Sequence, residues 1–401
     1  MGASSVEVAD VLRSYASGYL DRHPASLAQR KVINDLIGCR SARLGGHLRQ
    51  CPKCGHQLIA YNSCRNRHCP KCQRQKQADW LTSQAAYLLD VPYFHIVFTL
   101  PQSVGPLALQ NKRLLYGLLF RSAASAMLRM ACDPRHLGAK IGFTAILHTW
   151  GQTLMHHPHL HCLVPAGGLS QCGQTWVPAR QGFFLPVRPL ARLFRGCYMD
   201  GLRQAYNDGQ LELAGNLVSL SNPARWNTLL QELQQVDWVV YAKPAFGSPR
   251  IVLKYLARYT HRVAISNHRL LSADNGRVAF RYKDYQHHNR QRVMHLSAVE
   301  FIRRFLLHIL PKGFVRIRHY GLLANRSRDV AIALCRTLLD SRARVRSVPT
   351  PVPIDPSPDL PDNQNHFPCP VCDHTTTMVI ALLPPVRDGP AWYHSLYQLP
   401  V

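Results

Sequence analysis

The sequence predicts an α+β fold with an amino-terminal zinc-ribbon-like module. Three observations support this prediction. A stretch rich in cysteine and histidine fills residues 39–72, between two regions with helical periodicity. Segments rich in β-branched and aromatic residues then alternate with helical segments between residues 89 and 330. Six prolines between residues 348 and 361 favour a stiff, extended linker before a short tail.

These patterns divide the chain into three consecutive segments. Residues 1–88 are predicted to form a helical, zinc-binding domain that binds DNA, and residues 89–330 the α+β domain. Residues 331–401 hold the Pro-rich linker and a tail with a further CxxC pair. The expected helices are two within 5–38 and others at 80–89, 108–131, 189–206 and 249–260. The expected strands are 93–100, 143–150, 159–164, 238–242, 263–266, 278–282 and 293–296.

The charge of the chain points to a polyanionic partner. Forty-eight Lys and Arg against 22 Asp and Glu give a net charge of +26, so DNA is the first partner to expect and an anionic membrane the alternative. No apolar run approaches the length of a spanning helix, and no secretory pattern opens the sequence. We therefore expect a cytoplasmic protein, in which the odd number of 13 cysteines favours metal binding over disulfides.

Two CxxC pairs, Cys51–Cys54 and Cys69–Cys72, are separated by 14 residues. Each pair can present two thiolates to one ion, so this spacing predicts a tetrahedral, structural zinc site. Cys64 and His68 have their own spacing of four and are candidates for a second site, completed by Cys39, His47 or His56, although Cys39 alone also fits a small buried hydrophobe. The tail pair Cys369 and Cys372, flanked by His366 and His374, fits a smaller site, the completion of another one, or a turn without a ligand.

Basic residues surround the cysteine pairs. On a zinc scaffold such side chains usually contact phosphates, which makes this module a DNA-binding or positioning element. The basic residues of the stretch are Lys53, Arg65, Arg67, Lys71, Arg74 and Lys76, of which Arg65, Arg67 and Lys71 are the principal DNA-binding candidates.

His159 and His161 form the central motif, in the segment HHPHLHCLV. On a strand the two imidazoles point to one face while the apolar residues between and after them point to the other, so both can reach one metal ion. His148 is the expected third ligand if residues 142–150 pair antiparallel with 159–164, and Gln152 is the next candidate for that role. A histidine-rich surface strand is the alternative interpretation.

Tyr255 and Tyr259 lie four residues apart in the predicted helix that begins at Ser248-Pro249. A basic row, Arg250, Lys254 and Arg258, runs beside them and can meet a phosphodiester backbone. A tyrosine attacks phosphorus when its proton is removed and the phosphate charge is neutralised, a task for a divalent ion on the histidines. Packing of an amphipathic helix is the alternative role for the two phenols.

Taken together, these motifs resemble the two-tyrosine HUH transposases of rolling-circle insertion sequences, the group typified by insertion sequence ninety-one. The matching stretches follow the family's order over about residues 39 to 325. They read CPKCG…SCRNRHCPKCQ, FHIVFTLP, LHTWGQTLMHHPHLHCLVPAGG, YLARYTHRVAIS, FRYKDY and FIRRFLLHILPKGFVRIRHYG. The Pro-rich stretch and the last CxxC pair match least well.

The resemblance implies a palm-like antiparallel sheet with flanking helices, a divalent ion (Mg or Mn) on His159 and His161, and Tyr255 and Tyr259 as nucleophiles. One tyrosine would cleave single-stranded DNA to leave a 5′-phosphotyrosine and a free 3′-hydroxyl, which then attacks a second phosphotyrosine. No nucleotide cofactor is expected, and no GxxxxGK[ST] sequence occurs. The role of His148 as third metal ligand does not follow from the resemblance. The resemblance does imply a bacterial protein that associates with the nucleoid.

Three other functions remain open on the sequence alone. A rolling-circle replication initiator or a relaxase would share the histidines and tyrosines but not the zinc module. A transposase with three carboxylates would need more acidic residues in informative places than Asp284 of FRYKDY. A non-catalytic, zinc-dependent DNA-binding protein would use neither tyrosine for chemistry.

Overall fold

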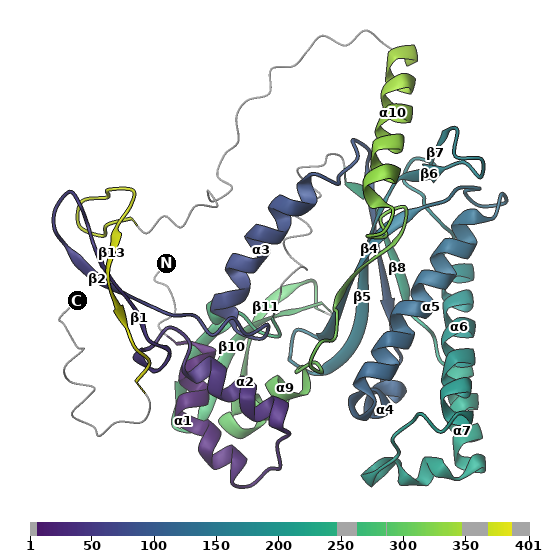
Figure 1. Ribbon diagram of the computed structural model, residues 1–401. Coiled ribbons are helices and arrows are strands. Elements are labelled where there is room, and N and C mark those ends of the chain that lie inside the picture. The colour runs from purple at the N-terminus through teal and green to yellow at the C-terminus, as the bar shows by residue number, and fades with distance from the viewer. Residues whose placement is uncertain (1–5, 247–262, 286, 347–367, 387–401) are drawn as a thin grey trace. The chain divides into compact units, whose positions relative to one another are not determined.

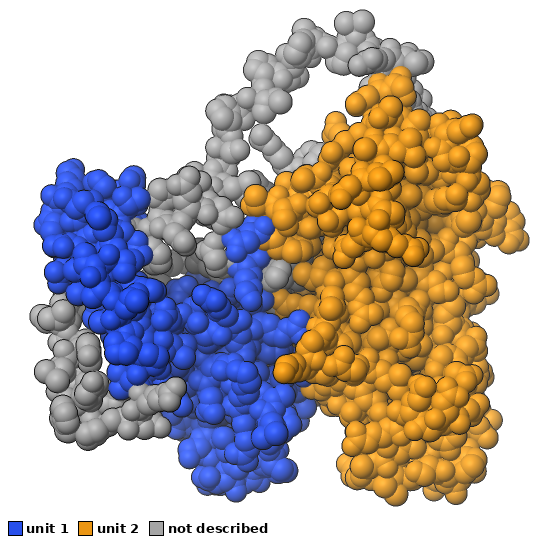
Figure 2. Space-filling model, viewed as in Figure 1, with its two compact units in different colours: residues 1–79, 261–309, 355–401 blue, residues 80–260, 310–354 orange. Residues whose placement is uncertain are grey.

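The structure is a computed structural model that describes residues 6–246, 263–285, 287–346 and 368–386. The chain forms two compact units (Figure 2), one of residues 1–79, 261–309 and 355–401, the other of residues 80–260 and 310–354. The α+β prediction is confirmed, because helices and antiparallel sheets make up both units. Among the described residues, no helix has the length and apolar character needed to cross a bilayer.

The first unit combines helices with two three-stranded sheets (Figure 1). Its helices are α1 (Val8–Leu20), α2 (Leu27–Ile37) and α9 (Ala298–Leu307), and α3 (Pro70–Ala85) leads from it into the second unit. One sheet has the order β13-β1-β2, formed by Met378–Leu383, Gly46–Gln50 and Gln57–Tyr61. The other has the order β11-β10-β9, formed by Arg290–Ser297, Arg277–Asp284 and Leu270–Asp274.

This unit is discontinuous in sequence, unlike the three consecutive segments predicted above. Residues 261–309 cluster with the amino-terminal helices because specific contacts join them. The backbone amide of Val8 donates to Asn267 Oδ1 at 3.2 Å, and the Tyr15 hydroxyl donates to the carbonyl of Ala273 at 3.3 Å. Patterns within a short window carry no information on such pairings between distant segments.

The second unit is built on a five-stranded antiparallel sheet with the order β12-β4-β5-β3-β8. Its strands are β3 (Tyr93–Thr99), β4 (Gly142–Trp150), β5 (His156–Pro165), β8 (Val240–Phe246) and β12 (Ile317–Gly321). The helices are α4 (Gly105–Gln110), α5 (Lys112–Cys132), α6 (Val187–Asn207), α7 (Pro223–Gln235) and α10 (Arg328–Arg346), and a small hairpin joins β6 (Gly167–Leu169) to β7 (Trp176–Pro178).

The helices α5 and α6 lie together along one face of the sheet (Figure 1). Phe98 of β3 and Leu160 of β5 are fully buried in the core between sheet and helices, and Phe194 of α6 meets the Phe98 ring edge-on at a centroid distance of 5.0 Å. Burial of these apolar side chains fixes the inner face of the sheet. The polar side chains that alternate with them must therefore lie on the opposite face.

Two local predictions have a different outcome. The expected strand at 263–266 is wrong: the structure has a bend there, and Val263, Ala264 and Ile265 are buried without strand pairing. Their apolar character reflects burial, which a loop can also provide. The expected helix at 249–260 lies outside the described residues.

Candidate metal centres and active site

Three histidines meet on the face of the five-stranded sheet that lies opposite the core beneath α5 and α6. His159 and His161 lie on β5, the central strand, and the intervening Leu160 points into the core, as the alternation predicts. The expected pairing of β4 with β5 is confirmed, with His148 directly opposite His159. One nitrogen from each of the three rings lies within 4.8 Å of the others. The structure thus brings His148 together with the HxH pair and leaves Gln152 in the connecting turn.

The hydrogen bonds around the rings orient them towards a common point. The Nε2 atoms of His159 and His161 are 3.1 Å apart. The Nδ1–H of His159 donates to the carbonyl of His157 at 2.7 Å, and in this tautomer Nε2 is the nitrogen that can bind a metal. The Nδ1 of His161 lies 2.9 Å from Nε2 of His95, on the side of the ring away from His159.

His95 is a site residue that the sequence analysis did not single out. It lies on β3, is 4% exposed, and stacks on His161 with a centroid distance of 5.1 Å. Burial, with smaller contributions from the charges of Lys243 and His159, lowers the pKa of His95 to about 3, so the ring is neutral at physiological pH. A neutral His95 can accept the Nδ1 proton of His161, and this bond keeps Nε2 of His161 unprotonated.

This arrangement fits a divalent ion. The three neighbouring rings supply the nitrogen donors typical of transition-metal sites, and two of them are held with the correct nitrogen inward. His148 is 3% exposed and stacks on Trp150, which fixes the plane of its ring. Three protein ligands leave coordination positions for a phosphate oxygen, as a catalytic site requires.

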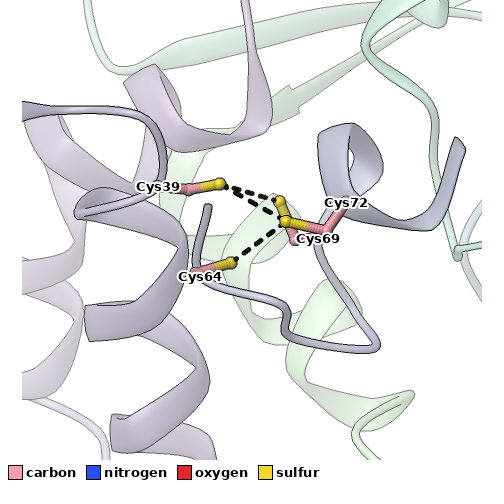
Figure 3. A group of neighbouring side chains, drawn as sticks. All are labelled: Cys39, Cys64, Cys69 and Cys72. Atoms are coloured by element: carbon pink, nitrogen blue, oxygen red, sulfur yellow. Dashed lines mark hydrogen bonds between the residues drawn. The ribbon is translucent and has the colours of Figure 1, made fainter. Parts of the chain in front are cut away.

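A first group of four cysteines lies in the first unit, between the end of α2 and the start of α3. It consists of Cys39, Cys64, Cys69 and Cys72, which point towards one another (Figure 3). Cys72 Sγ lies 3.6 Å from the sulfurs of both Cys39 and Cys64, and Cys69 Sγ lies 3.5 Å from that of Cys39. A disulfide would require about 2.05 Å, whereas four sulfurs at about 2.3 Å from one zinc ion lie about 3.8 Å apart. Hydrogen bonds from the other thiols, first that of Cys39, lower the pKa of Cys72, so its thiolate forms readily.

A second group of four cysteines brings together an amino-terminal and a carboxy-terminal CxxC pair. It consists of Cys51, Cys54, Cys369 and Cys372. The sulfurs of Cys51 and Cys372 are 3.5 Å apart, and so are those of Cys54 and Cys369. All three regions, residues 51–54, 369–372 and the strands next to them, belong to the first unit.

The prediction that both amino-terminal CxxC pairs hold one ion is therefore wrong. Cys51 and Cys54 follow β1 at the tip of the β1–β2 hairpin, and β2 then runs back until Tyr61 pairs with Gly46. Five residues of strand span about 16 Å, so Cys64 and the pair that follows it return to the base of the hairpin, next to Cys39. Cys39 thus lies in a group of four cysteines that could hold a metal ion.

The histidine candidates near the cysteines are not in either group. His68, predicted as a zinc ligand, lies outside both, and its backbone amide donates to Asn66 Oδ1 at 2.9 Å. The described candidates His47, His56 and His374 also lie outside them, and His366 is outside the described residues. Four thiolates complete each tetrahedron, which leaves no position for an imidazole.

Comparisons with known proteins give two family matches and two relatives. Residues 11–100 match a family model described as a transposase zinc-binding domain, and residues 142–330 match one described as a putative transposase. A putative transposase of Sinorhizobium fredii is 48% identical over 397 residues, which cover 97% of this chain and 98% of the relative. The transposase for insertion sequence element IS801 of Pseudomonas savastanoi pv. phaseolicola is 31% identical over 299 residues, covering 74% of this chain and 70% of the relative.

The chain belongs to the insertion sequence ninety-one family of transposases. It is therefore an enzyme that acts on DNA, and it carries a zinc-binding domain. No solved structure gives a significant match. The putative-transposase match contains the three histidines, and the zinc-binding match contains the first group of four cysteines but ends before Cys369 and Cys372.

The residues predicted to touch DNA in this transposase differ in their surroundings. Arg65 is exposed, with its backbone at a positive φ of 53°. Lys71 Nζ forms an ion pair with Glu7 Oε2 at 2.6 Å, and burial lowers the pKa of the half-buried Arg67. Arg65 is thus the most accessible of the three. The remaining candidates, namely the nucleophiles Tyr255 and Tyr259 and the basic Arg250, Lys254 and Arg258, lie outside the described residues.

Proposed function

We propose that this transposase nicks and rejoins single-stranded DNA at the ends of its element, through 5′-phosphotyrosine intermediates, during rolling-circle transposition. The observation that carries the proposal is the set of His148, His159 and His161, whose ring nitrogens lie together on one face of the central sheet. Such a site suits one metal ion with free coordination positions, and the two tyrosines of the sequence supply nucleophiles. The net charge of +26 supports DNA binding and an association with the nucleoid.

A divalent ion on the three histidines would neutralise and polarise the scissile phosphate. The phenolate oxygen of Tyr255 or Tyr259 attacks the phosphorus, and the bond to the 3′-oxygen breaks. This step leaves a 5′-phosphotyrosine and a free 3′-hydroxyl. That hydroxyl attacks the phosphorus of a second phosphotyrosine, releases the tyrosine and forms a new phosphodiester. One ester bond replaces another in each step, so the reaction needs no nucleotide cofactor.

The ligand set also bears on the choice between Mg and Mn. Magnesium prefers oxygen ligands in near-ideal octahedral geometry, whereas imidazole nitrogen suits the transition metals. Three imidazoles, with no carboxylate in the group among the residues that the structure describes, therefore favour Mn over Mg. A hydrogen bond from His161 Nδ1–H to His95 supports this role because it leaves Nε2 of His161 as the nitrogen that would bind the ion.

We also propose that Cys39, Cys64, Cys69 and Cys72 hold the structural zinc of the zinc-binding domain. Four sulfurs at contacts of 3.5 and 3.6 Å support this assignment. The ion would fix the end of α2 to the start of α3 and so hold Arg65, which lies between two of the ligands, in place for DNA. Closed tetrahedral coordination makes the ion structural rather than catalytic.

The proposal is tested with 5′- and 3′-labelled single-stranded DNA that carries the element's ends, incubated with the protein and Mn or Mg. We expect a covalent adduct between protein and the 5′ end of the cleaved strand, which EDTA prevents. The Tyr255→Phe, Tyr259→Phe double variant should bind the DNA but form no adduct, and the His159→Ala, His161→Ala variant should behave alike. Adduct formation by the double tyrosine variant, or none by the wild-type protein with either metal, would contradict the mechanism.

A further inference from the structure

We propose that Cys51, Cys54, Cys369 and Cys372 hold a second structural zinc ion, which fastens the carboxy-terminal segment to the amino-terminal β1–β2 hairpin. The transposase zinc-binding match ends at residue 100, so it accounts for neither Cys369 nor Cys372. The site goes beyond the proposed DNA chemistry, because it concerns how the first unit is held together. Three independent features of the structure support it.

The first feature is the geometry of the sulfurs. Sulfur–sulfur distances of 3.5 Å separate Cys51 from Cys372 and Cys54 from Cys369, so the contacts link the two CxxC pairs. All four sulfurs lie within 4.8 Å of one another. These distances are much too long for disulfides and close to those of four sulfurs around one zinc ion. The group has the same four-thiol composition as the first group, so the same metal is expected.

The second feature is that the two CxxC turns are copies of each other. They read CPKCGH at residues 51–56 and CPVCDH at residues 369–374. In the first, Cys51 N–H donates to the carbonyl of His56 at 2.9 Å and Gly55 N–H to that of Cys51 at 3.0 Å. In the second, the bonds from Cys369 N–H to His374 and from Asp373 N–H to Cys369 have the same lengths of 2.9 and 3.0 Å.

The residue after each second cysteine completes this likeness. Gly55 and Asp373 both have positive φ, 73° and 51°, which turns the chain back towards the first cysteine. Glycine and aspartate tolerate this conformation better than most residues. The third CPxC sequence does not share it: Cys72 lies in the first turn of α3 and is followed by Gln73 of the same helix. Two equivalent turns facing each other form the usual ligand frame of a zinc ribbon.

The third feature is the lack of apolar burial in the strands that this site joins. Among the described residues of β1, β2 and β13, Gly46 alone is buried. On β13, Met378 is 62% exposed and Leu382 is 74% exposed. Buried side chains occur instead at Cys51, Cys369 and Thr377, the last of which is held by Arg49 through a hydrogen bond of 2.9 Å to Oγ1. Strand pairing with so little hydrophobic burial requires another source of stability, which a bound metal ion provides.

Zinc content tests the site directly. In a His159→Ala, His161→Ala background, which removes the histidine site, we expect two zinc ions per chain. Cys369→Ser with Cys372→Ser should leave one, and Cys64→Ser with Cys72→Ser should also leave one. The matched control is Cys132→Ser with Cys172→Ser, two exposed thiols outside both groups, which should keep two ions. Two ions in the Cys369, Cys372 variant, or a single ion in the background protein, would overturn the proposal.

Cobalt substitution identifies the ligands independently of zinc counting. The visible absorption of tetrahedral tetrathiolate cobalt should fall by half in the Cys369, Cys372 variant and stay unchanged in the control. An unchanged spectrum in the Cys369, Cys372 variant would show that these thiols bind no metal.

A cleavage experiment tests the fastening role. A protease site is introduced into the Pro-rich stretch 348–361 of the full chain, which is cleaved and passed over a size-exclusion column. The carboxy-terminal fragment should remain with the body of the wild-type protein and separate from it in the Cys51→Ser, Cys54→Ser variant, which retains the first zinc. Loss of the fragment from the zinc-loaded wild type, or its retention by that variant, would refute the role.

Discussion

Replacing His95 tests whether the hydrogen bond behind His161 controls metal binding. His95→Phe removes the neighbour of His161 Nδ1, now 2.9 Å away, and keeps an aromatic ring in a site that is 4% exposed. The variant removes the hydrogen bond with His95 that favours the His161 tautomer with its proton on Nδ1. His95→Gln can restore an acceptor oxygen, so it separates loss of the hydrogen bond from loss of the ring.

The size of the effect depends on the burial of the bond, which is part-buried because His95 is 4% exposed and His161 is partly exposed. Loss of the partner of a buried hydrogen-bonding group costs about 1–3 kcal/mol, which sets the upper range. Since about 1.4 kcal/mol is a tenfold change in affinity, this range corresponds to roughly 5- to 150-fold. Loss of a group that hydrogen-bonds to a histidine ligand typically lowers metal affinity by about 10- to 100-fold. We therefore expect His95→Phe to weaken Mn binding by about 10- to 100-fold, and His95→Gln by less.

Calorimetric titration of Mn into the purified protein measures this effect without relying on DNA cleavage. The control is His156→Phe. His156 is a half-buried histidine at the start of β5, and it hydrogen-bonds to Tyr116 of α5 at 2.8 Å rather than to a ring of the histidine group. It should leave the affinity for Mn within about threefold of the wild type. A folded His95→Phe protein that binds Mn as tightly as the wild type would refute the reasoning, as would an equal loss in His156→Phe.

Three further predictions concern stability and DNA binding. Burial, aided by the charge of Arg328, lowers the pKa of His319 to about 4, so the unfolded chain binds more protons between pH 4 and 6.5. The free energy of unfolding should fall by up to about 3 kcal/mol as pH drops through that window, and urea titrations of His319→Gln should show a shallower fall; an identical pH slope would count against it. Phe98→Ala should cost about 3–5 kcal/mol because the ring is fully buried, and a loss below about 1.5 kcal/mol in chemical denaturation would contradict the packing. Arg65→Ala should weaken the binding of all DNA sequences and reduce the salt dependence of affinity by about one released ion. Lys71→Ala should have a smaller effect because Lys71 forms an ion pair with Glu7. Salt-dependent binding curves in which Lys71→Ala loses more affinity than Arg65→Ala would refute this.

The histidine pair and its neighbouring strand were predictable because their geometry is local. Alternation along one strand places His159 and His161 on the same face, and a short connection forces β4 and β5 to pair antiparallel. His148 then falls opposite His159 from the register alone. Neither step requires knowledge of the rest of the fold.

His95 was not predictable in this way because its role depends on the strand order. β3 precedes β4 in sequence, yet it pairs with the far side of β5, with Val97 opposite His161. His95 then lies two residues from that position on the same face and reaches His161 diagonally. The segment FHIVFTLP identifies a strand, but it does not identify the strand's neighbour.

The pairing of the cysteines fails for a related reason. Cys54 and Cys369 are 315 residues apart. Cys69 and Cys72 are much closer in sequence to Cys51 and Cys54, so the spacing predicted that these two pairs share one ion. A signal was nevertheless present in the residue after each pair. Gly55 and Asp373 suit a turn with positive φ, whereas Gln73 continues a helix. The sequence thus contained the distinction between a zinc-ribbon turn and a helix start, although CxxC spacing alone did not reveal it.

The two kinds of candidate metal-binding group, cysteine and histidine, suit different roles, one structural and one catalytic. Each cysteine group has four soft ligands and closes its tetrahedron, so an ion there can stabilise the fold but has no position for substrate. The histidine group has three nitrogen donors, and its outer hydrogen bonds orient the rings without filling the remaining coordination positions of an ion. In the proposed mechanism a phosphate oxygen must exchange at the metal, whereas a structural ion must keep its ligands. Ligand number and ligand type therefore support our proposal that the second unit carries the chemistry and that the ions of the first unit stabilise its fold.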